Sequence, residues 1–493
     1  MKYDVIIIGS GLGGLVCASV LSRSGRSVLL LERETQAGGC IQSYKRRGMR
    51  FDTGFHYVGG LGEGQSLHAA FDYLGLLRLP WQRLDEAFDR VTIADRTFAF
   101  MQGYDAFVDA LAAEFPAERK GLELYARLLR YTGEHQFDAL NPSAPESSDF
   151  PDLVETSAYG YLERTFNDSL LINVLSGTSL KMELRRESLP LFTFAHGNGS
   201  FIESSWRLKG DGSLIVDSLL NDIRSRGGDI VYNAEVTELV EQGGKLRCAV
   251  CADGERYEGD TFISDVHPAV TCGWVKQSER MKKVYRNRIA RLENTFGMFT
   301  VSLALKPQSV RYFNCNRYVY RRPDVWTFYQ ADAPVSGILI SCRVPDDGSE
   351  YTRQLDLLTP MPWSRCTPWT DTTVGRRGEA YRQMKEQMAD ECMTLAERIL
   401  PGLSRHVEAR YTSTPLTYRD YTFTPEGSAY GLRKDFNSPM LTMLSPRTPI
   451  PNLLLTGQNL MLHGLHGVTM TALFTCAEVM GKEKIWNIVN TNQ

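Results

Sequence analysis

Near its N-terminus the chain reads Val5-Ile6-Ile7-Ile8-Gly9-Ser10-Gly11-Leu12-Gly13-Gly14. The four aliphatic residues are typical of a strand that is buried on both faces. The glycines at 9, 11 and 14 have the G-x-G-x-x-G spacing of dinucleotide-binding turns. Gly9 permits the tight turn, Gly11 lets backbone amides approach a pyrophosphate, and Gly14 lets the following helix pack closely. The stretch therefore predicts a strand, a phosphate-binding turn and the start of a helix.

The next residues complete one βαβ unit. Helical apolar spacing runs over residues 15–23, and Val28–Leu31 reads as a second buried strand. Glu32 follows this strand, eighteen residues after Gly14. A carboxylate at this place can accept hydrogen bonds from a ribose diol, and it disfavours a 2′-phosphate. NAD or FAD is therefore preferred to NADP.

The remainder of the chain predicts an α/β fold whose Rossmann-like domain is discontinuous in sequence. Residues 236–240 and 246–252 read as hairpin strands, and residues 452–456 read as a late strand followed by an apolar helix from about Val468. We expect the cofactor domain to comprise residues 1–84, 202–284 and 419–493. Residues 85–201 and 285–418 would form an inserted α+β substrate-binding domain.

Composition narrows the function. The chain has 493 residues, 55 Lys and Arg against 58 Asp and Glu, and 43% hydrophobic residues. This is an ordinary globular composition, and the net charge of −3 gives no reason to expect nucleic acid as a partner. Ten scattered cysteines favour a reducing, cytoplasmic location. No signal peptide or spanning helix is expected, although the charge-poor residues 452–480 are compatible with contact at a membrane surface.

A second glycine pair opens the segment Gly38-Gly39-Cys40-Ile41-Gln42-Ser43-Tyr44-Lys45-Arg46-Arg47-Gly48-Met49-Arg50-Phe51-Asp52-Thr53-Gly54. With the first glycine turn, this segment resembles the FAD-dependent phytoene desaturase, carotenoid isomerase and retinol saturase group of the flavin amine oxidase superfamily. Phe51 to Gly59, which includes His56, is most similar to retinol saturase-like proteins. The C-terminal Leu453–Asn459 and Gly464–Val468 also resemble the flavin segment of that group.

The resemblance implies FAD as the cofactor and implies which residues bind it. The adenine would meet backbone at Val236, and a helix near Gly467 would direct amides at the flavin ring. The complete set of cofactor-binding residues that we expect is Gly9, Gly11, Leu12, Gly13, Gly14, Glu32, Arg33, Gly38, Gly39, Val236, Gly457, Gly467, Val468 and Thr469.

His56 is the candidate catalytic residue, because imidazole suits proton transfer near neutral pH. The candidate substrate-pocket residues are His196, in a glycine-rich segment read as a loop, and Glu426, His463 and His466. For each of them a purely structural role stays open.

We predict no metal site. The chain has no HExxH motif or comparable ligand cluster. Cys248 and Cys251 have the spacing of a ligand pair, but they lie on an expected strand, where residues three apart point to opposite faces.

The leading hypothesis is an FAD-dependent oxidoreductase that acts on carbon–carbon bonds of an apolar isoprenoid, carotenoid or retinoid-like lipid. Hydride transfer at flavin N5 would serve saturation, which is slightly favoured over desaturation. Three alternatives stay open: a redox-neutral polyene isomerase that uses reduced FAD, a flavin amine or amino-acid oxidase, and a non-catalytic prenyl-lipid carrier. The sequence carries one complete dinucleotide fingerprint, so the electron donor or acceptor is undetermined.

Overall fold

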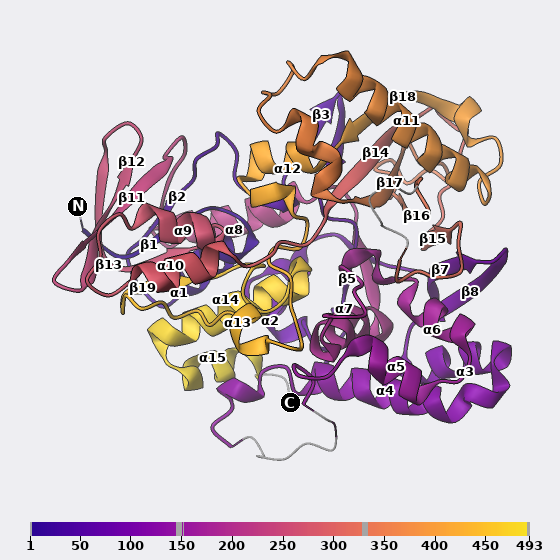
Figure 1. Ribbon diagram of the computed structural model, residues 1–493, viewed down its shortest axis with the longest axis horizontal. Helices are drawn as coiled ribbons and strands as arrows, with labels where there is room; N and C mark the ends of the chain where they lie inside the picture. The colour runs from indigo at the N-terminus through magenta and orange to yellow at the C-terminus, as the bar shows by residue number, and fades with distance from the viewer. Residues whose placement is uncertain (1, 144–149, 151, 328–333, 491–493) are drawn as a thin grey trace.

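The protein is built around two seven-stranded sheets, seen at the left and the upper right of Figure 1. The computed structural model describes residues 2–143, 150, 152–327 and 334–490. Helices of the first insertion gather at the lower right of the view. A surface loop that the composition of residues 141–152 predicts lies largely outside the described residues.

The first sheet has the order β10-β2-β1-β13-β12-β11, and β19 also pairs with β13. Strands β10, β2, β1, β13 and β19 are mutually parallel, and β12 and β11 continue as an antiparallel meander. The strands span β1 Lys2–Ile8, β2 Val28–Leu31, β10 Asp229–Val231, β11 Val236–Gln242, β12 Lys245–Cys251, β13 Arg256–Ser264 and β19 Leu453–Leu455.

Strand β13 divides one of its edges between two partners. Its N-terminal residues 256–258 pair with β12, and its C-terminal residues 262–264 pair with β19. The late strand therefore extends the sheet beside the part of β13 that faces the glycine turn. The predicted βαβ unit, the hairpin strands and the late strand are confirmed.

Helices cover both faces of this sheet. On one face α1 (Leu12–Arg23) contacts α8 (Ser213–Ser225) and α14 (Gly464–Met480). The guanidinium of Arg23 donates two hydrogen bonds to Asp222, which ties α1 to α8. On the other face, α9 (Pro268–Trp274) and α10 (Lys283–Ala290) pack with the core that contains Ile6 and Ile8. Helix α14 begins about one turn earlier than the predicted start near Val468.

The second sheet has the order β18-β14-β17-β16-β15-β7-β8 and draws strands from both insertions. Helix α11 (Gly378–Glu397) covers one face and buries Met388, Cys392 and Leu395 against it. All fifteen residues of β14 and β16 are buried, because the sheet is covered on both sides. Fourteen of them are aliphatic, aromatic, glycine, serine or sulphur-containing residues. The strands span β7 Ala87–Ile93, β8 Arg96–Met101, β14 Gly297–Leu305, β15 Asn316–Tyr320, β16 Gly337–Cys342, β17 Gln354–Met361 and β18 Val407–Ser413.

The segment around His196 is a helix, so the predicted glycine-rich loop is wrong. Helix α7 runs over Leu191–Glu203, and its glycines serve close packing. A β-carbon at Gly197 would overlap the Met182 methyl group, and one at Gly199 would lie 3.2 Å from the Leu129 carbonyl oxygen. The other helices of this insertion are α3 Tyr104–Glu114, α4 Arg119–Glu134, α5 Ala158–Thr165 and α6 Ser169–Ser176.

Shorter elements connect the two large sheets. A three-stranded sheet has the order β5-β9-β6, and β3 pairs with β4. Within the described ranges, no helix has the length and apolar character needed to cross a membrane. The bounds of these connecting elements are β3 Ser43–Arg46, β4 Met49–Asp52, β5 Val58–Gly59, β6 Trp81–Arg83, β9 Ser205–Leu208, α2 His68–Tyr73, α12 Pro415–Thr422, α13 Pro439–Thr442 and α15 Lys482–Val489.

Substitution of Gly59 tests the tight contact between β5 and α7. A β-carbon at Gly59 would lie 2.5 Å from the backbone nitrogen of Phe201, so Gly59→Ala should lower the free energy of unfolding by about 1–3 kcal/mol. Gly273→Ala is the matched control, because its β-carbon meets nothing within 4 Å on the exposed side of α9. The control should be neutral or stabilising by up to about 1 kcal/mol. Urea denaturation measures both, and equal stability of the two variants would contradict the contact.

Candidate functional site

One cavity connects the N-terminal glycine turn with the second sheet. It contains about 2330 Å³ of empty space, part of which is open to solvent. Its polar end includes Gly9–Gly13 and Glu32, and residues of α7, β14, β16 and β17 contribute to its other walls. Its two ends differ in chemistry, so the cavity suits a ligand or ligand pair with one polar and one apolar part.

Three glycine segments meet at the polar end of the cavity. A β-carbon at Gly39 would lie 3.1 Å from the α-carbon of Gly11, and one at Gly13 would lie 2.9 Å from the α-carbon of Gly457. The carboxylate of Asp265, directly after β13, lies beside Gly11 and Gly13 at 2.5 Å from either hypothetical β-carbon. A side chain at any of these glycines would overlap a neighbouring turn or Asp265. Because Gly11, Gly13 and Gly39 also line the cavity, their bare backbone fits a ligand that needs close backbone approach.

Glu32 lies at the end of β2 and helps to shape the turn. Its carboxylate accepts hydrogen bonds from the backbone N–H and the hydroxyl of Ser10 and from the backbone N–H of Glu34 (2.8 Å). The neighbouring Arg33 guanidinium lies 4.5 Å from the centre of the Phe423 ring and donates to the Asp420 carbonyl. Both side chains line the cavity beside the glycine turn.

Most of the expected cofactor-binding residues line the cavity, and three do not. Gly14 packs against the carbonyl of Gly9, and Gly457 packs against Gly13 and Asp265. Thr469 is fully buried in α14 with no hydrogen-bond partner for its hydroxyl. The residues that do line the cavity are Gly9, Gly11, Leu12, Gly13, Glu32, Arg33, Gly38, Gly39, Val236, Gly467 and Val468.

Four predicted histidines surround the cavity and are held neutral by burial. Burial, followed by the charge of Arg207, lowers the pKa of His56 to about 4, and its Nε2 atom has no partner. Burial also lowers the pKa of His463 to about 4, although its ring donates to the Lys181 carbonyl (2.7 Å). The pKa values of His466 and His196 fall to about 4 and about 3 for the same main reason.

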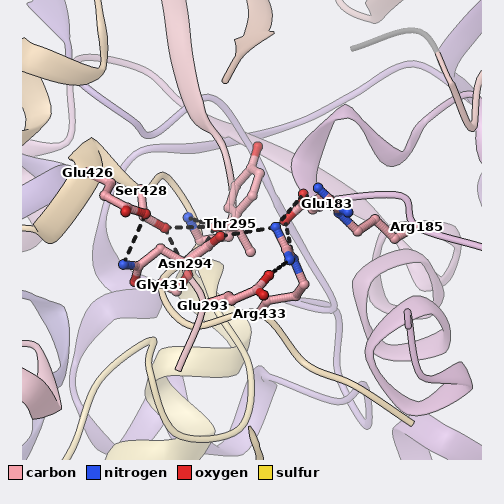
Figure 2. A network of polar contacts seen from close by, with 10 residues as sticks. Glu183, Arg185, Glu293, Asn294, Thr295, Glu426, Ser428, Gly431 and Arg433 are labelled. Carbon is pink, nitrogen blue, oxygen red and sulfur yellow. Dashed lines mark hydrogen bonds and ion pairs between the residues drawn. The ribbon is translucent and has the colours of Figure 1, made fainter. Parts of the chain in front are cut away.

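Glu426 lies outside the cavity lining, which corrects its predicted place in the substrate pocket. It is exposed, has a positive φ of 57°, and accepts a weak hydrogen bond from the Asn294 amide (3.4 Å). Figure 2 shows the network that holds this segment, with Thr295 bonded to Ser428 nearby. The left-handed turn at Glu426 directs its side chain toward that network.

Two cations at the cavity, Lys181 and Arg207, are not among the site residues expected from the sequence. Lys181 lines the cavity, and the Tyr57 hydroxyl next to it donates to Asp89 (3.0 Å). The side chain of Arg207 is charged, which in a sequence usually indicates a solvent-exposed position, yet Arg207 is only 3% exposed. Lys181 lies between Leu180 and Met182 with no recognisable motif, so no sequence signal pointed to it.

No group of three or more potential metal ligands occurs among the residues that the structure describes. All ten cysteines are described, and all are free thiols. Cys40 lines the cavity beside Gly39, and burial raises the pKa of its thiol to about 11.

The chain is similar to one protein family and to several known enzymes. Residues 7–74 match the NAD(P)-binding Rossmann-like domain family. All-trans-retinol 13,14-reductase from Homo sapiens is 23% identical and aligns with 99% of this chain and 87% of its own. Prolycopene isomerase from Daucus carota is 25% identical, over 87% of this chain and 72% of its own. The chain is a distant relative of these two kinds of enzyme.

The resemblance drawn from the sequence motifs is thereby confirmed. The structure of putrescine oxidase superposes with a TM-score of 0.65 at 14% identity, over 97% of this chain and 99% of that one. This likeness confirms the mixed α/β fold. The family match places a dinucleotide-binding type of domain at residues 7–74.

Asp265 should make stability depend on pH. Burial is the main cause that raises its pKa from 3.8 to about 7, so the folded chain keeps a proton that the unfolded chain releases from about pH 4 upward. Stability is therefore lost as the pH rises through 7. Asp265→Asn should be more stable than the parent chain at pH 8, on the order of 1 kcal/mol, and nearly equal at pH 4.

Asp222→Asn is a control of opposite sign. Burial works to raise the pKa of Asp222, but hydrogen bonds from Ser19 and Arg23 outweigh it and lower the pKa. This variant should therefore lose stability near neutral pH. Thermal unfolding of the cofactor-free variants across pH measures both effects, and a pH-independent difference for Asp265→Asn would contradict the assignment.

Proposed function

We propose that the protein is an FAD-dependent oxidoreductase that reduces a carbon–carbon double bond of a polyene, retinoid-like or carotenoid-like lipid. The observation that carries this proposal is the single cavity that joins the glycine cradle and Glu32 to an apolar chamber. The apolar chamber suits an apolar substrate. The reductase relatives align along nearly the whole chain, and the reaction in their name supports reduction. The isomerase relatives make redox-neutral isomerisation the second candidate.

The cofactor would lie along the polar end of the cavity. Backbone at Gly11, Gly13 and Gly39 would approach the pyrophosphate, and Glu32 would bind the adenosine ribose while still accepting from Ser10. Val236, the first residue of β11, would contact the adenine through its backbone. Because α14 starts at Gly464, the free amides of its first turn lie before Val468 and would face the flavin ring.

The domain assignment forms part of the proposal. We assign cofactor binding to residues 1–84, 202–284 and 419–493 and substrate binding to residues 85–201 and 285–418. The apolar chamber supports this assignment, because Met298 of β14, Leu339 of β16 and Leu358 of β17 line it.

When bound, FAD would supply hydride exchange with the substrate at its N5 atom. The chain would position the polyene and exclude water. His56 lies in the cavity wall with an unpartnered Nε2 atom, and its low pKa keeps it neutral. We therefore assign His56 to a hydrogen bond with the bound molecules rather than to acid catalysis.

Anaerobic single-turnover spectroscopy tests the function. The purified chain should retain FAD, and the dithionite-reduced complex should reoxidise on addition of all-trans-retinol while the polyene absorption moves to shorter wavelength. Unchanged flavin with altered polyene geometry would favour isomerisation. A chain that retains no flavin would favour the lipid carrier, and turnover of amines with peroxide formation would favour the amine oxidase.

Gly13→Val is the matched variant for cofactor binding. Its side chain would overlap Asp265 and the backbone of Gly457 and would displace the turn, so affinity for FAD should fall by about tenfold or more. Gly273→Ala, far from any contact, should bind FAD like the parent chain. Titration with FAD measures both, and unchanged affinity of Gly13→Val would move the cofactor away from the glycine cradle.

Substitution of His56 separates a hydrogen-bonding role from an acidic one. His56→Phe should lower kcat by about 10²-fold, whereas His56→Gln, which keeps a polar end, should lose about tenfold or less. The parent kcat should show no inflection from this histidine between pH 5 and 8, because its pKa is about 4. Steady-state rates across pH measure this, and a limb near pH 6.5 that disappears in His56→Gln would contradict it.

A further inference from the structure

Lys181 presents a charged amine to the apolar cavity. It ends the short 3-10 helix Ser179–Lys181, and its Nζ atom lies 3.3 Å from the Tyr57 hydroxyl oxygen and 3.8 Å from the centre of the Phe201 ring. The side chain keeps an intermediate exposure although it lies deep in the protein, because the surface it exposes faces the cavity. An ammonium has three N–H donors, so donors remain for a ligand.

A chain of hydrogen bonds connects Lys181 to a second buried cation. The Tyr57 hydroxyl accepts from Lys181 and donates to Asp89 (3.0 Å), whose other oxygen accepts from the Asn316 amide (2.9 Å). The Asn316 oxygen accepts in turn from the Arg207 guanidinium (2.6 Å). Asp89 and Asn316 are both 0% exposed.

The charges of this network do not balance. Lys181 and Arg207 are cations, and the charges of both act on the carboxyl group of Asp89. Among the described residues, neither cation has a carboxylate oxygen within 4.0 Å. Glu183, two residues after Lys181, is bound to Arg185 and Arg433 instead, as Figure 2 shows. A buried network of net charge +1 is costly unless one anion completes it.

Unpartnered polar atoms also occur on residues that line this cavity. His56 Nε2, next to Tyr57 in sequence, has no partner. The hydroxyls of Thr193 and Ser200 on α7 also have none, and Ser200 precedes the Phe201 that contacts Lys181. All three residues line the cavity. The lining also includes the apolar Met298, Leu339 and Leu358, so Lys181 is a cationic group in a wall that is otherwise partly apolar.

We propose that Lys181 binds the carboxylate of an amphipathic polyene acid, with Arg207 behind it supplying the remaining positive charge. The inference that the ligand is a polyene rests on the proposed function. The inference that it carries a carboxylate follows from the uncompensated positive charge of Lys181 and Arg207. A pure hydrocarbon would leave the cations of the network unbalanced, so the site would discriminate against it.

Binding should depend on the charge of Lys181. Burial, partly offset by Asp89, lowers its pKa to about 8, so the ammonium is present near pH 7 and lost above pH 8. Burial lowers the pKa of a second buried lysine, Lys434, to about 7, which makes it the matched control. The titratable and charged groups that contact the Lys181 segment or belong to its network are Tyr57, Asp89, Arg207, Tyr318, His463 and Tyr430, and the charge of Arg207 acts on His56.

Equilibrium binding to the FAD-loaded full chain tests the proposal. The probes are all-trans-retinoic acid, all-trans-retinol and the matched hydrocarbon that lacks the oxygen, titrated by tryptophan fluorescence at about pH 7 and about pH 9.5. The parent chain should prefer the acid to the hydrocarbon by about tenfold or more at the lower pH and should lose most of this preference at the higher pH.

Three variants sharpen the result. Lys181→Met should erase the preference while keeping hydrocarbon binding, Lys181→Arg should keep the preference at both pH values, and Lys434→Met should behave like the parent chain. If Lys181→Met does not fold, the pH-independent preference of Lys181→Arg carries the test. Equal affinities for acid and hydrocarbon in the parent chain, no binding of any probe, or an unchanged preference in Lys181→Met would overturn the proposal.

Failure of this inference is distinguishable from failure of the proposed function. Flavin reoxidation and polyene absorption are recorded on the same samples. Tight acid binding without any polyene reduction would refute the proposed function alone. Reduction without preference for the acid would refute the role of Lys181 alone.

Discussion

The junction of three glycine turns around the Asp265 carboxylate is the constraint on which the cavity depends. Gly11, Gly39 and Gly457 come from distant parts of the sequence, yet their backbones approach so closely that a β-carbon at any of them would contact another turn or Asp265. The junction fixes the start of α1 against the end of β13 and brings the late strand β19 beside them. A cleft that exposes backbone amides follows directly from the missing side chains.

Local signals in the sequence predicted the elements that surround this junction. The aliphatic run before Gly9 and the position of Glu32 defined β1, α1 and β2, since periodicity and glycine spacing are properties of neighbouring residues. The same reasoning misread the segment of His196, because Gly197 and Gly199 are there to admit Met182 and Leu129 and not to turn the chain. Contacts of that kind arise from tertiary packing, which a single sequence does not display.

The buried charged residues could not be predicted from the sequence for the same reason. Lys181 and Arg207 carry no motif, and one network links them only because the 3-10 helix Ser179–Lys181, β9 and the second sheet pack together around Asp89. The network of Figure 2 holds this arrangement in place, since Glu183 ties the segment of Lys181 to Arg433 and Arg433 also pairs with Glu293. Polar groups thus fix the geometry of a largely apolar chamber.

The shared edge of β13 has a consequence for biosynthesis. β1 pairs with a strand that follows it by about 250 residues, and β13 receives its last neighbour only when residues 453–455 have left the ribosome. At roughly 5–20 residues per second, β1 pairs early with β2 on one edge but waits on the order of tens of seconds for β13 on the other. One edge of β1 therefore stays unpaired until β13 has been synthesised, and the glycine junction is complete only once Gly457 has followed.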